Sequence, residues 1–248
     1  MSLAMRIVSE ADPRPFQRRS PQNKRKPFAS SEAVYGKEAL RVLAKDDDRS
    51  FWLFMTAVLK GNYVTPDYRI SIQNEIEPML PPDGPILDLM SDVYSCVQRR
   101  PGRITHGVGL NASLLSQNAA LDGYQEYDLN AAPYFSSQIL YRAAVISFGL
   151  PYLTSPLEVL RSVAGCLAPG SSIITICSIL HNDEKGTALW GNAEKYNVFN
   201  RIRLAEDYLR HAGYEDVYSG ELSCPVSPEL APFRNFFASI FSTGITAQ

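Results

Sequence analysis

The stretch ILDLMSDVYSCV, residues 86–97, decides how the rest of this chain is interpreted. It begins with a short apolar run that ends on an acid, Asp88, as does the first strand of many parallel α/β sheets that bind a nucleotide. Such a strand is normally followed by a glycine-rich turn, because glycine lets the backbone approach a ligand closely. Here Met-Ser-Asp-Val-Tyr, residues 90–94, stands in place of the glycines. The stretch therefore predicts a familiar sheet with an unusual first loop.

The chain around this stretch alternates between strand-like and helix-like segments. Short apolar runs predict strands at 86–90, 104–110, 123–127, 143–148, 172–177, 214–219 and 235–242. Helical spacing predicts helices at 31–44, 48–61, 71–80, 112–118, 155–167 and 198–212. We expect Pro169-Gly170 to end the helix at 155–167. The alternation predicts an α/β protein with a Rossmann-like, mostly parallel seven-stranded sheet, helices on both faces and an antiparallel last strand.

Charge and composition divide the 248 residues into three parts. Residues 1–30 are basic and rich in proline, which predicts a disordered N-terminal arm. Residues 31–84 are expected to form a helical segment that packs on the core. Residues 85–242 are expected to form the Rossmann-like domain, with an insertion at 180–200. The chain as a whole carries a formal charge of −2. This net charge does not indicate that the folded part binds nucleic acid.

The cysteine pattern and the hydropathy indicate the kind of cellular compartment in which the protein resides. The four cysteines are scattered, with no CxxC pair, which predicts neither a metal site nor a disulfide framework. This usage indicates a reducing compartment, either the cytoplasm or the matrix of a plastid or mitochondrion. No apolar run reaches the roughly 18 residues that a membrane span needs, and no signal-peptide pattern is present. We expect a soluble protein.

Several motifs, in order, resemble the class I S-adenosylmethionine-dependent methyltransferases. The segment SFGLPYLTSPLEVLRSVAGCLAPGSSIITICS, residues 147–178, resembles that family's fourth strand, helix, L-x-P-G turn and fifth strand. YDLNAAP (127–133) resembles the acidic loop after the third strand, and VGLN (108–111) the end of the second. ILDLMSDVYSCV, HGVGLNASLL and LPYLTSPLEV resemble a poorly characterised bacterial and plant subgroup whose first loop also lacks glycines. The resemblance covers residues 63–242 and implies S-adenosylmethionine as cofactor.

The resemblance implies cofactor contacts after the first two strands. Asp88, Met90 and Ser91 correspond to the first motif, and Ser91 is suited to donate to the carboxylate of the cofactor. Asn111, after the second strand, stands where the family has an acid that holds the ribose hydroxyls. Its amide can bind a diol without the strength of a charged acceptor. The alternative for Asn111 is a cap on the following helix.

The resemblance also implies contacts after the third and fourth strands. Asp128 corresponds to the acceptor for the adenine amino group, and Leu129 to a backbone N–H donor. The alternative for Asp128 is a local Asx turn. Phe148 and Gly149 correspond to the place where a backbone carbonyl receives the amino group of the cofactor.

The glycine-free loop leaves two arrangements open. Residues 90–94 all carry a Cβ and disfavour positive φ, so we expect a right-handed path that turns into a helix near Ser91. The pocket above it is then either shifted and wider, or closed by the side chains of Met90 and Tyr94.

Methyl transfer asks mainly for orientation of an electrophile that is already reactive. The weak candidates for a catalytic role are His181, which can serve as a base or be a solvated loop residue, and Tyr152, which can line the chamber or pack on a helix. The leading hypothesis is a methyltransferase for a small-molecule or protein acceptor. The alternative is a catalytically inactive methyltransferase-like subunit of a larger complex, in the cytoplasm or an organelle, that uses the basic segment 13–28. A nucleic-acid partner ranks last, because that segment has few aromatic residues.

Overall fold

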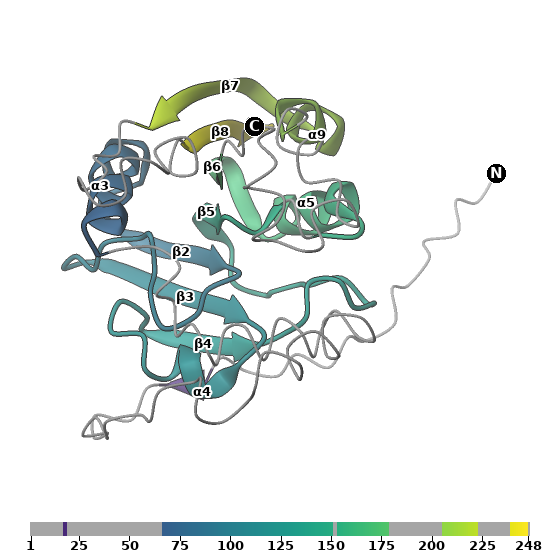
Figure 1. Cartoon of the computed structure of the whole chain (residues 1–248). Helices are drawn as coiled ribbons and strands as arrows, with labels where there is room; N and C mark the ends of the chain where they lie inside the picture. The colour runs from purple at the N-terminus through teal and green to yellow at the C-terminus, as the bar shows by residue number, and fades with distance from the viewer. Residues whose placement is uncertain (1–16, 19–65, 151–152, 179–204, 223–238, 248) are drawn as a thin grey trace, which may run out of the picture.

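The computed structural model describes residues 17–18, 66–150, 153–178, 205–222 and 239–247, which form one open sheet with helices beside it (Figure 1). The strands are β1 (Gln17–Arg18), β2 (Gly84–Leu89), β3 (Arg103–Gly109), β4 (Gly123–Glu126), β5 (Tyr141–Ser147), β6 (Leu167–Ser178), β7 (Tyr214–Leu222) and β8 (Ser239–Thr246). The helices are α3 (Pro66–Ile76), the 3-10 helix η2 (Glu77–Met79), α4 (Ala112–Leu115), α5 (Pro156–Ala164) and α9 (Ala205–Ala212).

The sheet has the order β1-β4-β3-β2-β5-β6-β8-β7. Strand β2 pairs in parallel with both β3 and β5, whereas β8 is antiparallel to β6 and to β7. Strands β2 to β8 confirm the expected seven-stranded, mostly parallel Rossmann-like sheet with an antiparallel last strand. Strand β1 adds two residues of the basic arm to the edge of β4, in antiparallel register.

Two predictions about boundaries were wrong around the helix expected at 155–167. Helix α5 ends at Ala164, and β6 begins at Leu167. Tyr141 pairs with Leu167, after which the register shifts so that Ala143 pairs with Ser172. Pro169-Gly170 therefore lies in this irregular start of β6, where Gly170 has a φ of 73°, and does not end the helix.

Alternation along β2 divides the core between the two faces of the sheet. Leu87 and Leu89 pack in a cluster with residues of α5 and α9. Ile86 packs on the opposite face in a cluster with Ile72 and Ile76 of α3. Helix α3 accordingly stands on one side of the sheet and α5 and α9 on the other (Figure 1). Asp88 shares the parity of Ile86, so its carboxyl is turned toward the α3 face.

A buried ion pair fixes the end of α3 to the amino end of β3. The guanidinium of Arg103, whose side chain is fully buried, donates to both carboxylate oxygens of Glu77 at 2.8 and 3.0 Å. It also donates to the carbonyls of Pro81 at 2.7 Å and Gln98 at 3.1 Å. This pair therefore holds η2, which directly follows α3, against the start of β3.

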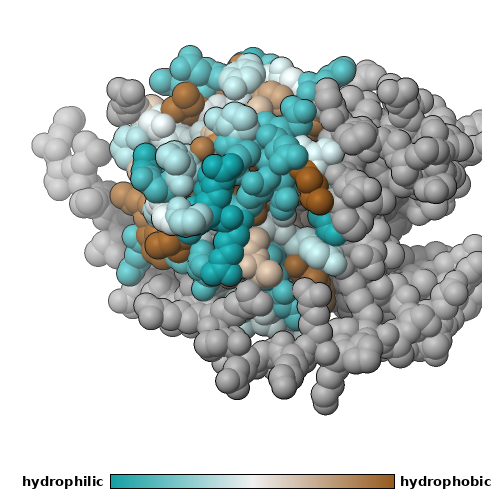
Figure 2. Space-filling model, turned by 90° about the vertical axis from the view of Figure 1, so that its left-hand side faces the viewer, coloured by the Kyte–Doolittle hydropathy of each residue, from teal (hydrophilic) through white to brown (hydrophobic). Residues whose placement is uncertain are grey.

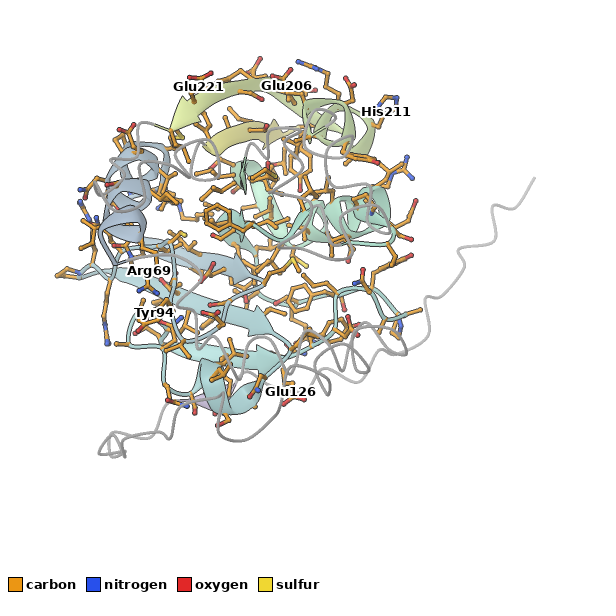
Figure 3. All side chains as sticks on the ribbon, in the orientation of Figure 1. Arg69, Tyr94, Glu126, Glu206, His211 and Glu221 are labelled. Atoms are coloured by element: carbon orange, nitrogen blue, oxygen red, sulfur yellow. The ribbon has the colours of Figure 1, made fainter. Side chains whose placement is uncertain are left out.

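The outer strand β7 is irregular and acidic. Its register against β8 shifts between Glu215 and Tyr218, and Asp216 within this shift has a φ of 48°. The side chains of Glu215, Asp216 and Glu221 are exposed, and Figure 3 shows Glu221 on this strand.

On the side seen from the left of Figure 1, the described residues form a mainly hydrophilic surface with separate hydrophobic spots (Figure 2). The large apolar side chains exposed on the described chain are Ile70, Tyr94, Ile104, Leu140, Tyr218 and Ile245. None of the helices in the described ranges has the length and apolarity of a membrane span.

Candidate functional site

The strand order reverses between β2 and β5. From β2 the chain moves outward through β3 to β4, and then returns to β5 and continues to β6 on the other side. In open α/β sheets, ligands bind outside the carboxyl ends of the strands at such a reversal. The loops that follow β2, β3, β4 and β5 therefore surround the candidate site.

The loop after β2 does not follow the expected right-handed path. Met90 has a φ of 58°, in the left-handed region that favours glycine, so the prediction for this residue was wrong. The physical reason lies in two neighbours. Gly109, at the end of β3, is so close that a Cβ on it would stand 2.1 Å from the carbonyl oxygen of Ser91. A Cβ on Gly149, just after β5, would stand 1.7 Å from Sδ of Met90.

The glycines missing from the loop are thus found beside it, Gly109 at the end of β3 and Gly149 just after β5. Close approach of two backbones requires that one of them lack a Cβ, and here the partner strand supplies that freedom. The Ser91 amide also donates to the Val108 carbonyl at 2.9 Å, which ties the loop to β3. The first loop therefore packs directly on Gly109 and Gly149.

The helix expected near Ser91 does not form, since residues 91–102 contain no helix. Side-chain oxygens accept hydrogen bonds from the backbone amides of this segment instead. Asp92 Oδ1 accepts from the Tyr94 amide at 2.9 Å, and Ser95 Oγ accepts from the Val97 amide at 2.8 Å. Such local bonds compete with helix formation. Gln73 of α3 donates to the Ser95 carbonyl at 2.8 Å, which holds this segment against α3.

Asp88 is the buried acid of the site. It is 1% exposed and accepts a hydrogen bond of 2.9 Å from Ser91 Oγ. Burial raises its pKa from the ordinary 3.8 to about 7, while hydrogen bonds from Ser95 and Ser91 oppose the shift and the charge of Asp92 adds to it. The carboxyl group therefore takes up or loses its proton near neutral pH.

Asn118 completes this buried polar group and was missed from the sequence. Its Nδ2 donates to the Asp92 carbonyl at 3.0 Å and lies 3.3 Å from Ser91 Oγ. It follows α4, and only its place at the end of a short helical pattern distinguishes it in the sequence. Asn118 anchors the first loop from the side of β3 and α4.

The raised pKa of Asp88 predicts a pH-dependent effect of Asp88→Asn on stability. The unfolded chain loses the proton near pH 3.8 and the folded chain near pH 7, so the cost of burying the charge grows as pH rises between these values. Relative to Asp88→Asn, the wild-type chain should lose about 2 kcal/mol of unfolding free energy between pH 5 and pH 8. Urea denaturation of both proteins at both pH values measures this difference, and a constant difference would contradict a pKa shift of this size.

Asn111 caps a helix, as one of the two sequence hypotheses proposed. Its Oδ1 accepts from the amides of Ser113 and Leu114 at 3.0 and 3.2 Å, at the start of α4. The side-chain NH₂ is the group left to donate to a ligand. Glu126, at the end of β4, accepts from the Ala112 amide at 3.2 Å and so lies beside α4 (Figure 3). Sequence reasoning missed Glu126, although its place as the last residue of a predicted strand could have indicated it.

The loop after β4 is tied to the loop after β5. Asp128 Oδ1 accepts from the Asn130 amide at 2.9 Å, which is the Asx turn considered for it. Asn130 Oδ1 accepts from the amide and hydroxyl of Thr154 at 2.8 and 3.2 Å. Leu129 is 4% exposed and packs in the core beside Leu87. These bonds hold two loops of the site at a fixed separation.

Phe148 and Gly149 follow β5 directly. Phe148 has a φ of 59°, and its amide donates to the Ile176 carbonyl at 2.7 Å. Its side chain packs against the core on the α3 face. The left-handed turn at Phe148 places Gly149 against Met90, across the point where the strand order reverses.

Tyr94 does not close the site. Its side chain is 42% exposed, and its ring stacks on Arg69 of α3, with the guanidinium carbon 3.3 Å from the ring centroid (Figure 3). Of the two side chains considered as a closing pair, only Met90 lies across the strand ends. The two catalytic candidates, Tyr152 and His181, lie outside the described residues. Among those described, no group of three or more His, Cys, Asp or Glu is placed to hold a metal ion.

Comparison with known proteins identifies the fold. No protein-family model and no curated protein sequence matches the chain. Phosphoethanolamine N-methyltransferase 2 of Haemonchus contortus, solved with S-adenosyl-L-methionine, has a TM-score of 0.57 at 11% identity, over 86% of this chain and 61% of that one. The same enzyme solved with phosphomonomethylethanolamine and S-adenosylhomocysteine has a TM-score of 0.53 at 10% identity, over 74% and 53%.

A third structure is shorter than this chain and is matched over almost its whole length. The S-adenosylmethionine-dependent methyltransferase of Mesorhizobium loti has a TM-score of 0.52 at 15% identity, over 71% of this chain and 97% of that one. The chain spans only about half to three fifths of the Haemonchus enzyme. The strand order and these similarities agree: the chain has the class I S-adenosylmethionine-dependent methyltransferase fold.

Proposed function

We propose that the chain binds S-adenosylmethionine at the carboxyl ends of β2 to β5 and transfers its methyl group to a small-molecule or protein acceptor. The observation that carries this proposal is the gathering of polar groups around the strand reversal. Asp88 is buried at the end of β2, Asn111 follows β3, and Asp128 follows β4. A core position such as that of Asp88 would hold an apolar residue if packing alone were required.

The residues fit the parts of the cofactor as follows. Ser91, once its hydroxyl turns from Asp88, matches the carboxylate of the amino-acid tail, and Asp92 matches its ammonium. The NH₂ of Asn111 matches an oxygen of the ribose, because the carbonyl of this side chain caps α4. On the adenine side, Asp128 matches the amino group and Leu129 supplies a backbone N–H.

The residues after β5 complete the site. We assign the ammonium of the cofactor to the Phe148 carbonyl and the transferable methyl group to the notch at Gly149. When bound, the cofactor supplies an electrophilic methyl group, so the protein mainly orients the acceptor. His181 and Tyr152 remain the residues proposed for a base and for a wall of the acceptor chamber.

A second candidate function is a methyltransferase-like subunit without catalysis, which would use the basic segment 13–28 to join a protein complex. The observation in its favour is the contact of Met90 with Gly149, which occupies the reversal point of the sheet. A cytoplasmic or organellar location is compatible with either function.

Calorimetric titration with S-adenosylhomocysteine tests the proposal. We expect micromolar binding by the wild-type chain and binding about tenfold weaker in Asn111→Ser, which keeps a helix cap but removes the NH₂ donor. Asn111→Asp is the matched control, because it keeps the cap and offers a charged acceptor to the ribose diol. Its affinity should equal or exceed that of the wild type.

The titration also separates the two candidate functions. No heat at millimolar ligand, from protein shown to be folded, would refute cofactor binding and favour the non-catalytic subunit. Equal affinity of the wild-type, Ser and Asp proteins would show that Asn111 serves only as a cap.

A further inference from the structure

The two strands that flank the reversal of the sheet end in the same unusual way. Met90 directly follows β2 and Phe148 directly follows β5, and their φ angles are 58° and 59°. Non-glycine residues in this region carry a conformational cost, and such residues gather where a structure performs a function. Strain on both sides of the reversal points to a functional role for the contact between these two loops.

That contact is made by the end of the Met90 side chain. A Cβ on Gly149 would lie 1.7 Å from Sδ, 2.8 Å from Cε and 2.7 Å from Cγ of Met90. The thioether therefore fills the notch left by the missing side chain of Gly149. It spans from the end of β2 to the end of β5, across the place where this kind of sheet binds its ligand.

The chemistry of methionine suits a contact that can be broken. Its side chain is unbranched, with three rotatable bonds, so it can leave one gap and fill another at low cost. Met90 is only partly buried, in contrast to Leu87 and Leu89 of the preceding strand, which are 0% exposed. Ser91 holds the backbone in place through Val108 and Asp88, so the side chain can move while the loop stays.

We propose that Met90 is a displaceable plug of the cofactor crevice. In the arrangement described here its thioether occupies the Gly149 notch, and a nucleoside ligand with an amino-acid tail binds only after the thioether swings out. This inference rests on the proposed function and adds a regulation to it. The apparent affinity equals the intrinsic affinity multiplied by the fraction of molecules that are open, and removal of the plug restores the intrinsic value.

The test is titration of the full chain with S-adenosylhomocysteine in three forms. Met90→Ala removes the thioether but keeps a Cβ, so the backbone requirement at this residue is unchanged. It should bind about tenfold more tightly than the wild type or better. Met90→Leu is the matched control: it keeps the volume in the notch and should bind no more tightly than the wild type.

The outcomes separate this inference from the function on which it rests. Wild-type binding that Met90→Ala leaves unchanged or weakens would refute the plug and make Met90 a wall of a working site. Absence of binding in all three proteins, each folded, would refute both the plug and the proposed function.

A second measurement covers the case in which Met90→Ala fails to fold. The chain has five methionines, so their ¹³C-labelled methyl groups give few signals, and Met90→Leu identifies the one from Met90. Addition of S-adenosylhomocysteine to the wild-type chain should move that signal by more than any other methionine signal. A bound complex in which it stays in place would overturn the proposal.

Discussion

Gly109→Ala is expected to lower the free energy of unfolding by about 3 kcal/mol, at the upper end of what overpacking costs. The added Cβ would stand 2.1 Å from the carbonyl oxygen and 3.2 Å from the carbonyl carbon of Ser91. These are backbone atoms, so no change of rotamer relieves the clash. Ser91 is itself held by its hydrogen bonds to Val108 and Asp88. The whole first loop would therefore have to move away from β3, and urea denaturation measures the loss.

Gly165→Ala is the matched control for this change. Gly165 is exposed at the end of α5, has a φ of −65°, and a Cβ there would meet its nearest neighbour, the Ser162 carbonyl oxygen, at 3.3 Å. The same addition of one methyl group should change stability by less than about 1 kcal/mol. A Gly109→Ala protein as stable as this control would show that the loop is not seated on Gly109.

Arg103→Met is expected to cost about 3 kcal/mol, the lower end of the effect of breaking a buried ion pair, because Arg100 Nε still pairs with Glu77 at 2.8 Å. The Arg103 side chain is 0% exposed, and Glu77 is 12% exposed. Methionine fills part of the space but leaves the carbonyls of Pro81 and Gln98 without the donor they have now. The loss should appear as an earlier midpoint in urea, with α3 detaching from the amino end of β3.

Arg142→Met supplies the comparison, because Arg142 forms an ion pair with Asp83 at the same end of the sheet but on the surface. The two side chains are 52% and 61% exposed, and pairs of this kind contribute less than about 1 kcal/mol. Similar costs for the two variants would mean that the Arg103 pair is not buried in solution.

The strands of the fold could be predicted from the sequence where their own residues form an apolar run. The apolar runs that predicted the strands at 86–90 and 143–148 lie within two residues of β2 and β5. Prediction failed at Pro169-Gly170, because a proline-glycine pair ends helices and also permits the register shift at the start of β6. Local sequence alone does not distinguish these two uses.

Local hydrogen bonds near the candidate site could be predicted from the sequence, whereas the conformation of its first loop could not. Asn111 and Asp128 form the local hydrogen bonds that short polar side chains favour, a helix cap and an Asx turn. The left-handed turn at Met90 could not be foreseen from its own neighbours. The space that permits it is provided by Gly109 and Gly149, which are distant in the chain and adjacent only in the folded sheet.

The irregular outer strand β7 has a consequence for how copies of this protein behave beside one another. A regular strand at the edge of a sheet offers unpaired backbone groups to which another chain can add, and this is a route to aggregation. In β7 the register shift at Glu215 and Asp216 interrupts the regular edge, and the acidic side chains there repel an identical edge. At the opposite end of the described sheet, β1 pairs with β4. The protein is thereby protected against edge-to-edge stacking when it is concentrated.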